Sequence, residues 1–243
     1  MKKIRILHLF SGVLDLYGDY KNLTVLCQRL EELGHEWEID RPEPFDPIEP
    51  AGYDMVYIGH GKARNLAAVA PHFVAHADAI RASIESGQLW FVTGNARELF
   101  GRGFTTVDGS SLDGVGIFEY FGIENNRVFV SDMVGRPDFN KDDLVYGFAN
   151  RTASLKGENR YPLFEVAVGF DDGEFSEGKE GTHYKNFYGT WCMGPILARN
   201  PSMMREFLRR LLGDEYRDCD YSLEQNALES VLSEFKIDES EER

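Results

Sequence analysis

The sequence has few cysteines, and the three that it has, Cys27, Cys192 and Cys219, lie far apart. Three scattered cysteines suggest neither a disulfide framework nor a zinc site, and we expect no metal. No apolar run approaches the ~20 residues that a membrane-spanning helix needs. Basic residues number 26 against 41 acidic ones, and the net charge of −15 disfavours nucleic acid and anionic membranes as partners.

The remaining composition is that of a folded globular protein. Apolar residues make up 42% of the chain and aromatic residues 13%. A length of 243 residues suffices for a well-filled core, so we expect a single domain over residues 1–243 with a charged tail over 238–243. The apolar part of the N-terminal segment is too short for a signal peptide, and we expect a cytoplasmic protein.

Strands and helices alternate over the first hundred residues. Apolar runs predict strands over 4–10, 36–40, 53–58 and 89–93. Helical spacing of apolar residues predicts one helix that ends at Gly34 and another, from Phe73, that ends at Gly87. This alternation is typical of an α/β fold, a three-layer sandwich in which helices cover a mostly parallel sheet.

The pattern changes after residue 105. Turn signals separate expected strands near 115–120, 127–134, 144–148, 163–170 and 187–191, and residues 171–181 read as an acidic, glycine-rich loop. Asn200 followed by Pro201 predicts a helix start. Ser222 and Gln225 have the spacing of a capping box for a last helix.

The segment 87–101, GQLWFVTGNARELFG, predicts a strand, a sharp turn and a helix. In α/β enzymes the residue at such an elbow is commonly a serine or cysteine nucleophile, but here it is Gly94. Elbow residues often adopt positive φ, which glycine tolerates best. We therefore expect Gly94→Cys to introduce a reactive thiol and to lower stability.

A second candidate site follows the third expected strand. Gly59, His60, Gly61, Lys62 and Arg64 lie at its carboxyl end, where ligands of open α/β sheets bind. We expect Arg97 nearby, at the amino end of the elbow helix, so that this basic group binds a small anion such as a carboxylate or phosphate. The alternative is that these are solvated side chains or partners of acids such as Glu98.

Five segments carry a resemblance to a known family. They are Leu16–Asn22, Tyr53–Gly61, Gly87–Gly101, Gly147–Asn150 and Gly189–Leu197. In this order they resemble segments of the class I glutamine amidotransferases of the cobyric acid synthase and GatD type. The resemblance implies a flavodoxin-like glutamine amidotransferase fold, work on cell-wall precursor amidation, and a Mur-ligase-like partner of the MurT type.

The catalytic positions of the family are substituted in this chain. Gly94 takes the position of the family's catalytic cysteine, and Met193 takes the position of its catalytic histidine. Arg151 takes the position of a further histidine, and Glu98 that of a glutamine. Amide hydrolysis of this kind needs a thiolate to attack and an imidazole to move the proton. Glycine and a thioether supply neither, so we expect no glutaminase activity at this site and assign no catalytic residue.

Three hypotheses about function follow. The first is a catalytically inactive partner or regulatory subunit of a Mur-ligase-like amidating enzyme, and the second is a stand-alone binder or enzyme of a small anion. The third is an active amidotransferase with a displaced dyad, drawn from Thr93, Cys192, His60 or His183. We expect no cofactor, and the candidate pocket residues are Gly59, His60, Gly61, Lys62, Arg64, Thr93, Gly94, Asn95, Arg97, Glu98, Cys192 and Met193.

Overall fold

A six-stranded sheet forms the centre of the protein in a computed structural model that describes residues 1–173 and 177–237. Its spatial order places β4 and β3 in the middle, as β11-β12-β4-β3-β1-β2, and all neighbours are parallel except β11 and β12. The predicted tail over 238–243 lies outside the described residues. The strands are β1 (Lys3–Leu9), β2 (Glu36–Asp40), β3 (Met55–Ile58), β4 (Leu89–Thr93), β11 (Thr182–Tyr184) and β12 (Phe187–Thr190).

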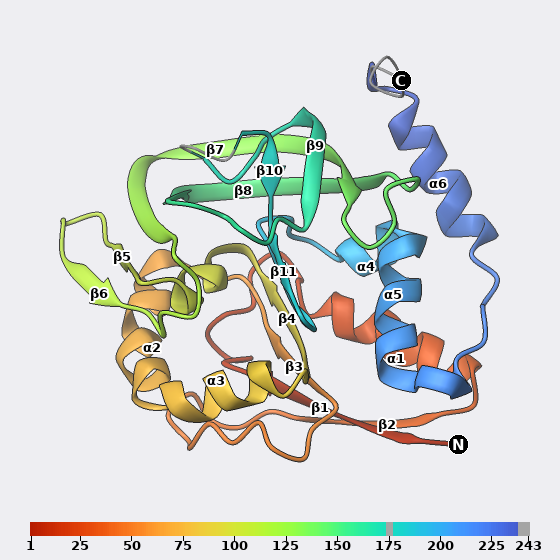
Figure 1. The fold of residues 1–243 in the computed structure, drawn as a ribbon, viewed down its shortest axis with the longest axis horizontal. Helices are drawn as coiled ribbons and strands as arrows, with labels where there is room; N and C mark the ends of the chain where they lie inside the picture. Colours follow the sequence, from red (N-terminus) through yellow and green to blue (C-terminus); the bar gives the residue numbers. More distant parts are fainter. Residues whose placement is uncertain (174–176, 238–243) are drawn as a thin grey trace.

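Helices cover both faces of this sheet (Figure 1). Successive residues of a strand point to opposite faces. Accordingly Trp90 donates from its indole Nε1 to Ser83 on one side, and the neighbouring Phe91 packs its ring against Phe207 on the other. The α/β sandwich is therefore confirmed. Its helices are α1 (Lys21–Glu32), α2 (Ala63–Ala75), α3 (Ala77–Glu85), α4 (Ile196–Arg199), α5 (Pro201–Leu212) and α6 (Ser222–Leu232).

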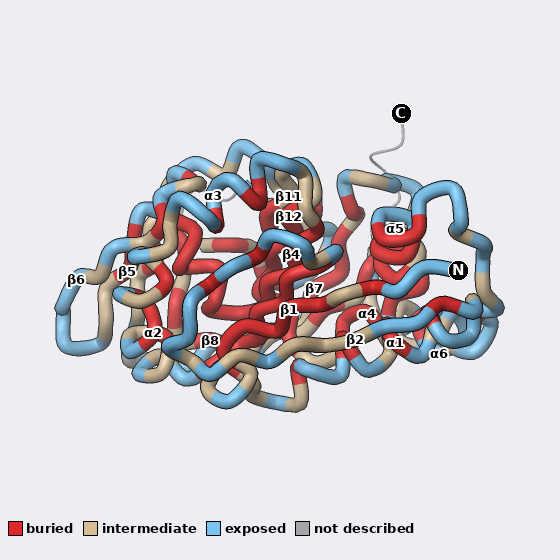
Figure 2. Tube along the Cα trace, turned by 90° about the horizontal axis from the view of Figure 1, so that it is seen from below, coloured by how far each residue is buried: buried red, intermediate tan, exposed pale blue. Residues whose placement is uncertain are grey.

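The central strands carry the core. Figure 2 shows buried segments running through β1 and β4, with exposed segments at the periphery. All four residues of β3 and all five of β4 are buried. Strands that are buried on both faces read as continuous apolar runs, which is why the sequence places them correctly.

A second sheet packs beside the first, and the sequence does not predict it as a separate sheet. Its order is β10-β9-β7-β5-β6, and β8 pairs with β7. The β7–β8 pair is a long antiparallel hairpin whose register shifts between Glu124 and Phe129. The strands are β5 (Gly103–Thr105), β6 (Ser111–Asp113), β7 (Phe121–Pro137), β8 (Val145–Lys156), β9 (Phe164–Gly169) and β10 (Lys179–Glu180).

Four local predictions outside the elbow are wrong. Lys179 and Glu180, within the expected loop over 171–181, form β10. Residues 115–120 form a loop rather than a strand, because the N–H groups of residues 115–118 bond to carbonyls of Leu99, Phe100 and Gly101 instead of a strand partner. The helix expected from Phe73 is two helices, α2 and α3, that meet at His76. The capping box is not formed, because α6 begins at Ser222 itself with Tyr221 as its N-cap.

Candidate functional site

The elbow after β4 has the backbone that the sequence predicts. Gly94 adopts a φ of 59°, in the left-handed region that glycine adopts at little cost. The residues Gly94–Phe100 then form a 3₁₀ helix, η1, rather than the expected α-helix. A Cβ atom on Gly94 would lie 2.6 Å from Cγ of His60 and closer still to its Nδ1. The imidazole therefore fills the space into which an elbow side chain would project.

The backbone of the elbow holds His60 in this place. The N–H of Asn95 donates to Nδ1 of His60 at 3.1 Å, and the ring of Tyr17 stacks on the imidazole. An accepting Nδ1 leaves the proton of the neutral ring on Nε2. Burial lowers the pKa of His60 to about 4, so the ring carries no charge at neutral pH. The N–H of Gly61 is also occupied, because it donates to Oδ1 of Asn95 at 3.0 Å.

A buried carboxylate, Asp19 in the loop after β1, joins the end of β4 to the loop after β3. The hydroxyl of Thr93 donates to its Oδ2, and the N–H of His60 donates to the same oxygen at 3.2 Å. Burial raises the pKa of Asp19 to about 6, against the opposing effect of these hydrogen bonds. The hydroxyl of Thr93 is thus committed to Asp19, which weakens the case for Thr93 as a displaced nucleophile.

Cys192, which follows β12 closely, is not a reactive thiol. Cys192 is fully buried, and burial raises the pKa of its thiol well above the ordinary value, so it stays protonated. A Cβ atom on Gly147 would lie 2.9 Å from Cβ of Cys192, which shows how closely β8 packs against the cysteine. Met193 is buried as well, and its N–H donates to the carbonyl of Phe148 at 2.9 Å.

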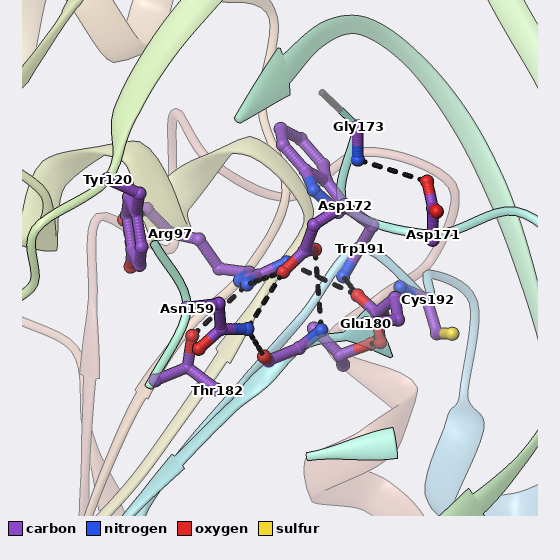
Figure 3. Close-up of polar contacts among 12 residues, drawn as sticks. Arg97, Tyr120, Asn159, Asp171, Asp172, Gly173, Glu180, Thr182, Trp191 and Cys192 are labelled. Carbon is purple, nitrogen blue, oxygen red and sulfur yellow. Dashed lines mark hydrogen bonds and ion pairs between the residues drawn. The ribbon is translucent and has the colours of Figure 1, made fainter. Parts of the chain in front are cut away.

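Arg97 does not join the loop that contains His60, so its predicted part in an anion site is wrong. Its guanidinium points into a buried cluster of polar side chains between the two sheets (Figure 3). It binds Asp172 at 2.6 and 3.0 Å, and it reaches Glu180 at 3.2 Å. The hydroxyl of Thr182 accepts a further bond at 3.1 Å. The acids that bind Arg97 come from beyond residue 170, where local sequence patterns give no indication of them.

This cluster holds the backbone just before Met193, the residue at the position of the family's histidine. The carboxylate of Glu180 accepts from the N–H of Trp191 at 2.6 Å and from the hydroxyl of Thr190 at 2.8 Å. Burial raises the pKa of Glu180, and the charge of Asp172 raises it further, against the opposing charge of Arg97. These charged groups are all buried, so removing one of them would leave its partners as unpaired buried charges, which is strongly destabilising.

His183, the remaining candidate base, lies elsewhere. Its Nδ1 pairs with Oδ2 of Asp138 at 2.7 Å, and its ring stacks on Tyr188. It does not line the cavity described next.

A cavity of 430 Å³ lies at the carboxyl ends of β3 and β4, under the β7–β8 hairpin. Four of the predicted residues line it, and Arg64 lines a neighbouring cavity of 600 Å³ instead. Among the described residues, the lining of the first cavity includes none of Gly59, Thr93, Gly94, Arg97, Glu98, Cys192 and Met193. The four residues that do line it are His60, Gly61, Lys62 and Asn95.

The far wall of this cavity comes from residues that the sequence does not assign to it. Tyr17, Glu124, Asn150 and Arg151 all contribute to the lining. The family resemblance could have pointed to three of these residues. Tyr17 and Asn150 lie within segments that resemble the family, and Arg151 directly follows one of them. The amide Nδ2 of Asn150 donates to the hydroxyl of Tyr17 at 3.2 Å, which joins the hairpin to the first loop.

Solved structures identify the class of the fold. A chain described as PurLQS from Thermotoga maritima aligns with a TM-score of 0.52 at 13% identity, over 95% of this chain and 99% of that one. A glutamine amidotransferase from Thermotoga maritima aligns with a TM-score of 0.51 at 12% identity, over 95% and 91%. No family model matches this chain. The protein has the fold of the class I glutamine amidotransferases, as the resemblance predicts.

Curated relatives narrow the class. The chain is 26% identical over 235 residues to the lipid II isoglutaminyl synthase (glutamine-hydrolyzing) subunit GatD of Streptococcus pneumoniae, covering 96% of this chain and 88% of that protein. It is 27% identical over 204 residues to the subunit of the same name from Staphylococcus aureus, covering 82% and 81%. The chain is therefore similar to GatD subunits over most of its length.

Proposed function

We propose that the protein is a GatD-like subunit of a lipid II-amidating complex that does not itself hydrolyse glutamine. In this proposal it docks in the cytoplasm on a Mur-ligase-like partner, which takes ammonia from solution. The observation that carries the proposal is the elbow, where Gly94 has no side chain and the ring of His60 occupies the adjacent space. The names of the GatD relatives supply the biological context. The described residues contain no helix long and apolar enough to cross a membrane.

The chemistry of the site supports the absence of glutaminase activity. Hydrolysis would require a thiolate to attack the amide carbon and an imidazole to protonate the departing ammonia. Neither Gly94 nor Met193 can do either. Loss of the nucleophile or the base alone typically costs several orders of magnitude in rate.

The two alternatives have less support. A displaced dyad would need an accessible nucleophile, but Thr93 is bound to Asp19 and Cys192 is a buried, protonated thiol. A site for a small anion would need converging positive charge, but His60 is neutral. Arg97 is also occupied by buried acids, and Arg64 lines the neighbouring cavity. Of the predicted basic residues, only His60 and Lys62 line the 430 Å³ cavity.

Affinity purification tests the docking part of the proposal. The tagged protein, isolated from its native host, is expected to bring down a Mur-ligase-like protein in a one-to-one ratio, measured by mass spectrometry and native mass. The isolated complex is then expected to amidate its substrate with ammonium as the nitrogen source. If the ligase is detected in the lysate but the tagged protein is recovered without it, the proposal is contradicted.

A further inference from the structure

Glu98 is a buried acid without a hydrogen-bond donor among the described residues. It lies on η1 and is 1% exposed, and neither of its carboxyl oxygens has a partner. The buried acids Asp19, Asp172 and Glu180 all accept hydrogen bonds, so Glu98 differs from them. A carboxylate that is buried without donors is very costly, whereas the neutral acid costs far less. The surroundings of Glu98 therefore favour its protonated form.

The carboxyl group of Glu98 packs directly against the backbone of β7. A Cβ atom at Gly122 would lie 2.9 Å from Cδ of Glu98, and closer still to its Oε2. A side chain at position 122 would therefore displace the acid. The same Cβ atom would lie 2.8 Å from Cβ of Phe104, so β5 packs beside this contact. The acid thus occupies a closely packed point where η1 meets β7.

Both elements that meet at Glu98 contribute to the wall of the 430 Å³ cavity. Asn95 of η1 lines this cavity, as do Glu124 and Asn125 of β7. Asn95 precedes Glu98 by one turn of η1, and Glu124 follows Gly122 closely on β7. The contact between Glu98 and Gly122 therefore ties two parts of the cavity wall together, although Glu98 itself does not line the cavity.

The titratable groups around Glu98 do not stabilise its charged form by hydrogen bonding. Burial raises the pKa of Glu98 well above its ordinary value, and the charge of Glu124 raises it further. The positive charges of Arg97 and Arg151 oppose this effect. Both guanidinium groups are bound elsewhere, Arg97 to the buried acids described above and Arg151 to two backbone carbonyls. The hydroxyl of Tyr120 donates to the carbonyl of Arg97 at 3.0 Å. Within residues 1–173 and 177–237, no group supplies the hydrogen bond that an ionised Glu98 needs.

We propose that Glu98 is a proton-controlled contact between η1 and β7, closed when the acid is neutral and opened when it ionises. The neutral acid packs against Gly122 and holds the two parts of the cavity wall together. When the proton leaves for solvent, the carboxylate needs water, and water reaches it only if η1 and β7 separate. Rising pH therefore loosens this wall of the cavity. The inference goes beyond the proposed function and does not depend on it.

The sign of the pH dependence follows from the direction of the shift. Because the pKa of Glu98 is raised in the folded protein, its contribution to stability is fully present below the ordinary glutamate pKa of about 4.3. The contribution is lost as pH rises toward the folded pKa. Over this range each pH unit is expected to raise the unfolding constant by about ten-fold, relative to a variant without the ionisable group.

Chemical denaturation of the full-length protein over a series of pH values tests the titration. Glu98→Gln keeps the shape of the neutral acid but cannot ionise. The ratio of the unfolding constants of the unaltered protein and this variant is expected to rise with pH, since the effects of other buried acids cancel in the ratio. Glu119→Gln changes an exposed acid that pairs with Arg102, and its ratio is expected to stay constant. A constant ratio for Glu98→Gln would overturn the proposal.

Hydrogen–deuterium exchange followed by mass spectrometry tests the local opening. The unaltered protein and Glu98→Gln are compared at each pH, so that the intrinsic pH dependence of exchange cancels. Exchange in peptides covering residues 94–100 and 121–125 is expected to increase with pH relative to the variant, while residues 36–40 of β2 show no relative change. An equal relative increase along the whole chain would show that no local contact opens, and the proposal would be wrong.

A second variant keeps the proposal testable if Glu98→Gln does not fold. Glu124→Gln removes the charge that raises the pKa of Glu98 further, so the folded pKa falls. In this variant the increase of exchange over residues 94–100 and 121–125 is expected to level off at a lower pH than in the unaltered protein. An identical pH profile for the two proteins would contradict the proposal.

Discussion

Replacement of Arg97 by methionine is expected to lower the free energy of unfolding by about 3–5 kcal/mol. The substitution keeps most of the side-chain volume but leaves Asp172 and Glu180 as buried acids without their cation. It also removes the hydrogen bond to Thr182, which lies on β11 of the central sheet, whereas Glu180 lies on β10 of the second sheet. Chemical denaturation followed by circular dichroism measures the change.

The pH dependence and a surface control separate this effect from a general loss of packing. Burial already raises the pKa of Glu180 against the opposing charge of Arg97, so without Arg97 this acid holds its proton more tightly when folded than when unfolded. Its contribution to stability is then most favourable at low pH and is lost as pH rises, so the deficit of the variant should shrink on acidification. Arg102→Met breaks an exposed pair with Glu119 and is expected to cost at most about 1 kcal/mol. An equal cost for both variants would contradict a structural role for the buried cluster.

Replacement of Gly94 by alanine is expected to lower the free energy of unfolding by about 2–4 kcal/mol. A left-handed backbone costs a residue other than glycine about 1–2 kcal/mol. The new methyl group must also displace the ring of His60, which breaks its hydrogen bond with the N–H of Asn95. Thermal and chemical unfolding measure the sum, and Gly94→Cys should move stability in the same direction.

Gly194 offers a matched control for the backbone part of this cost. It adopts a φ of 70°, and apart from its chain neighbours no atom of the described residues lies within 4 Å of its Cβ position. Gly194→Ala should therefore cost only the backbone part, about 1–2 kcal/mol. In a His60→Ala background the extra cost of Gly94→Ala should disappear, because the clashing ring is gone. If Gly94→Ala and Gly194→Ala cost the same in the unaltered background, His60 does not fill the elbow space as described.

The sequence predicts the middle of the central sheet well because β3 and β4 are buried on both faces. The run Leu89–Thr93 coincides with β4. Residues 36–40 coincide with β2, although this strand is at most half-buried. The positive φ of Gly94 also follows from the strand-turn-helix pattern. These features are determined by residues that are close together in the sequence, so local sequence patterns predict them.

The cavity and the buried charges could not be predicted in the same way. Arg97 looks like a free basic residue until a loop more than seventy residues later brings Asp172 to it. Glu124 and Arg151 reach the carboxyl ends of β3 and β4 only because the β7–β8 hairpin folds back over them. The register of that hairpin shifts between Glu124 and Phe129, which periodicity does not reveal.

The fate of the amide nitrogen of glutamine tests most directly whether the elbow has lost its chemistry. The complex isolated from the native host is supplied with glutamine labelled with ¹⁵N in the amide group, or with ¹⁵N-ammonium, and the amidated product is analysed by mass spectrometry. A site with Gly94 and Met193 in the catalytic positions predicts label in the product from ammonium, none from glutamine, and no release of labelled ammonia. Label that reaches the product from glutamine with unlabelled ammonium absent would contradict that prediction and would require a nucleophile elsewhere in the complex.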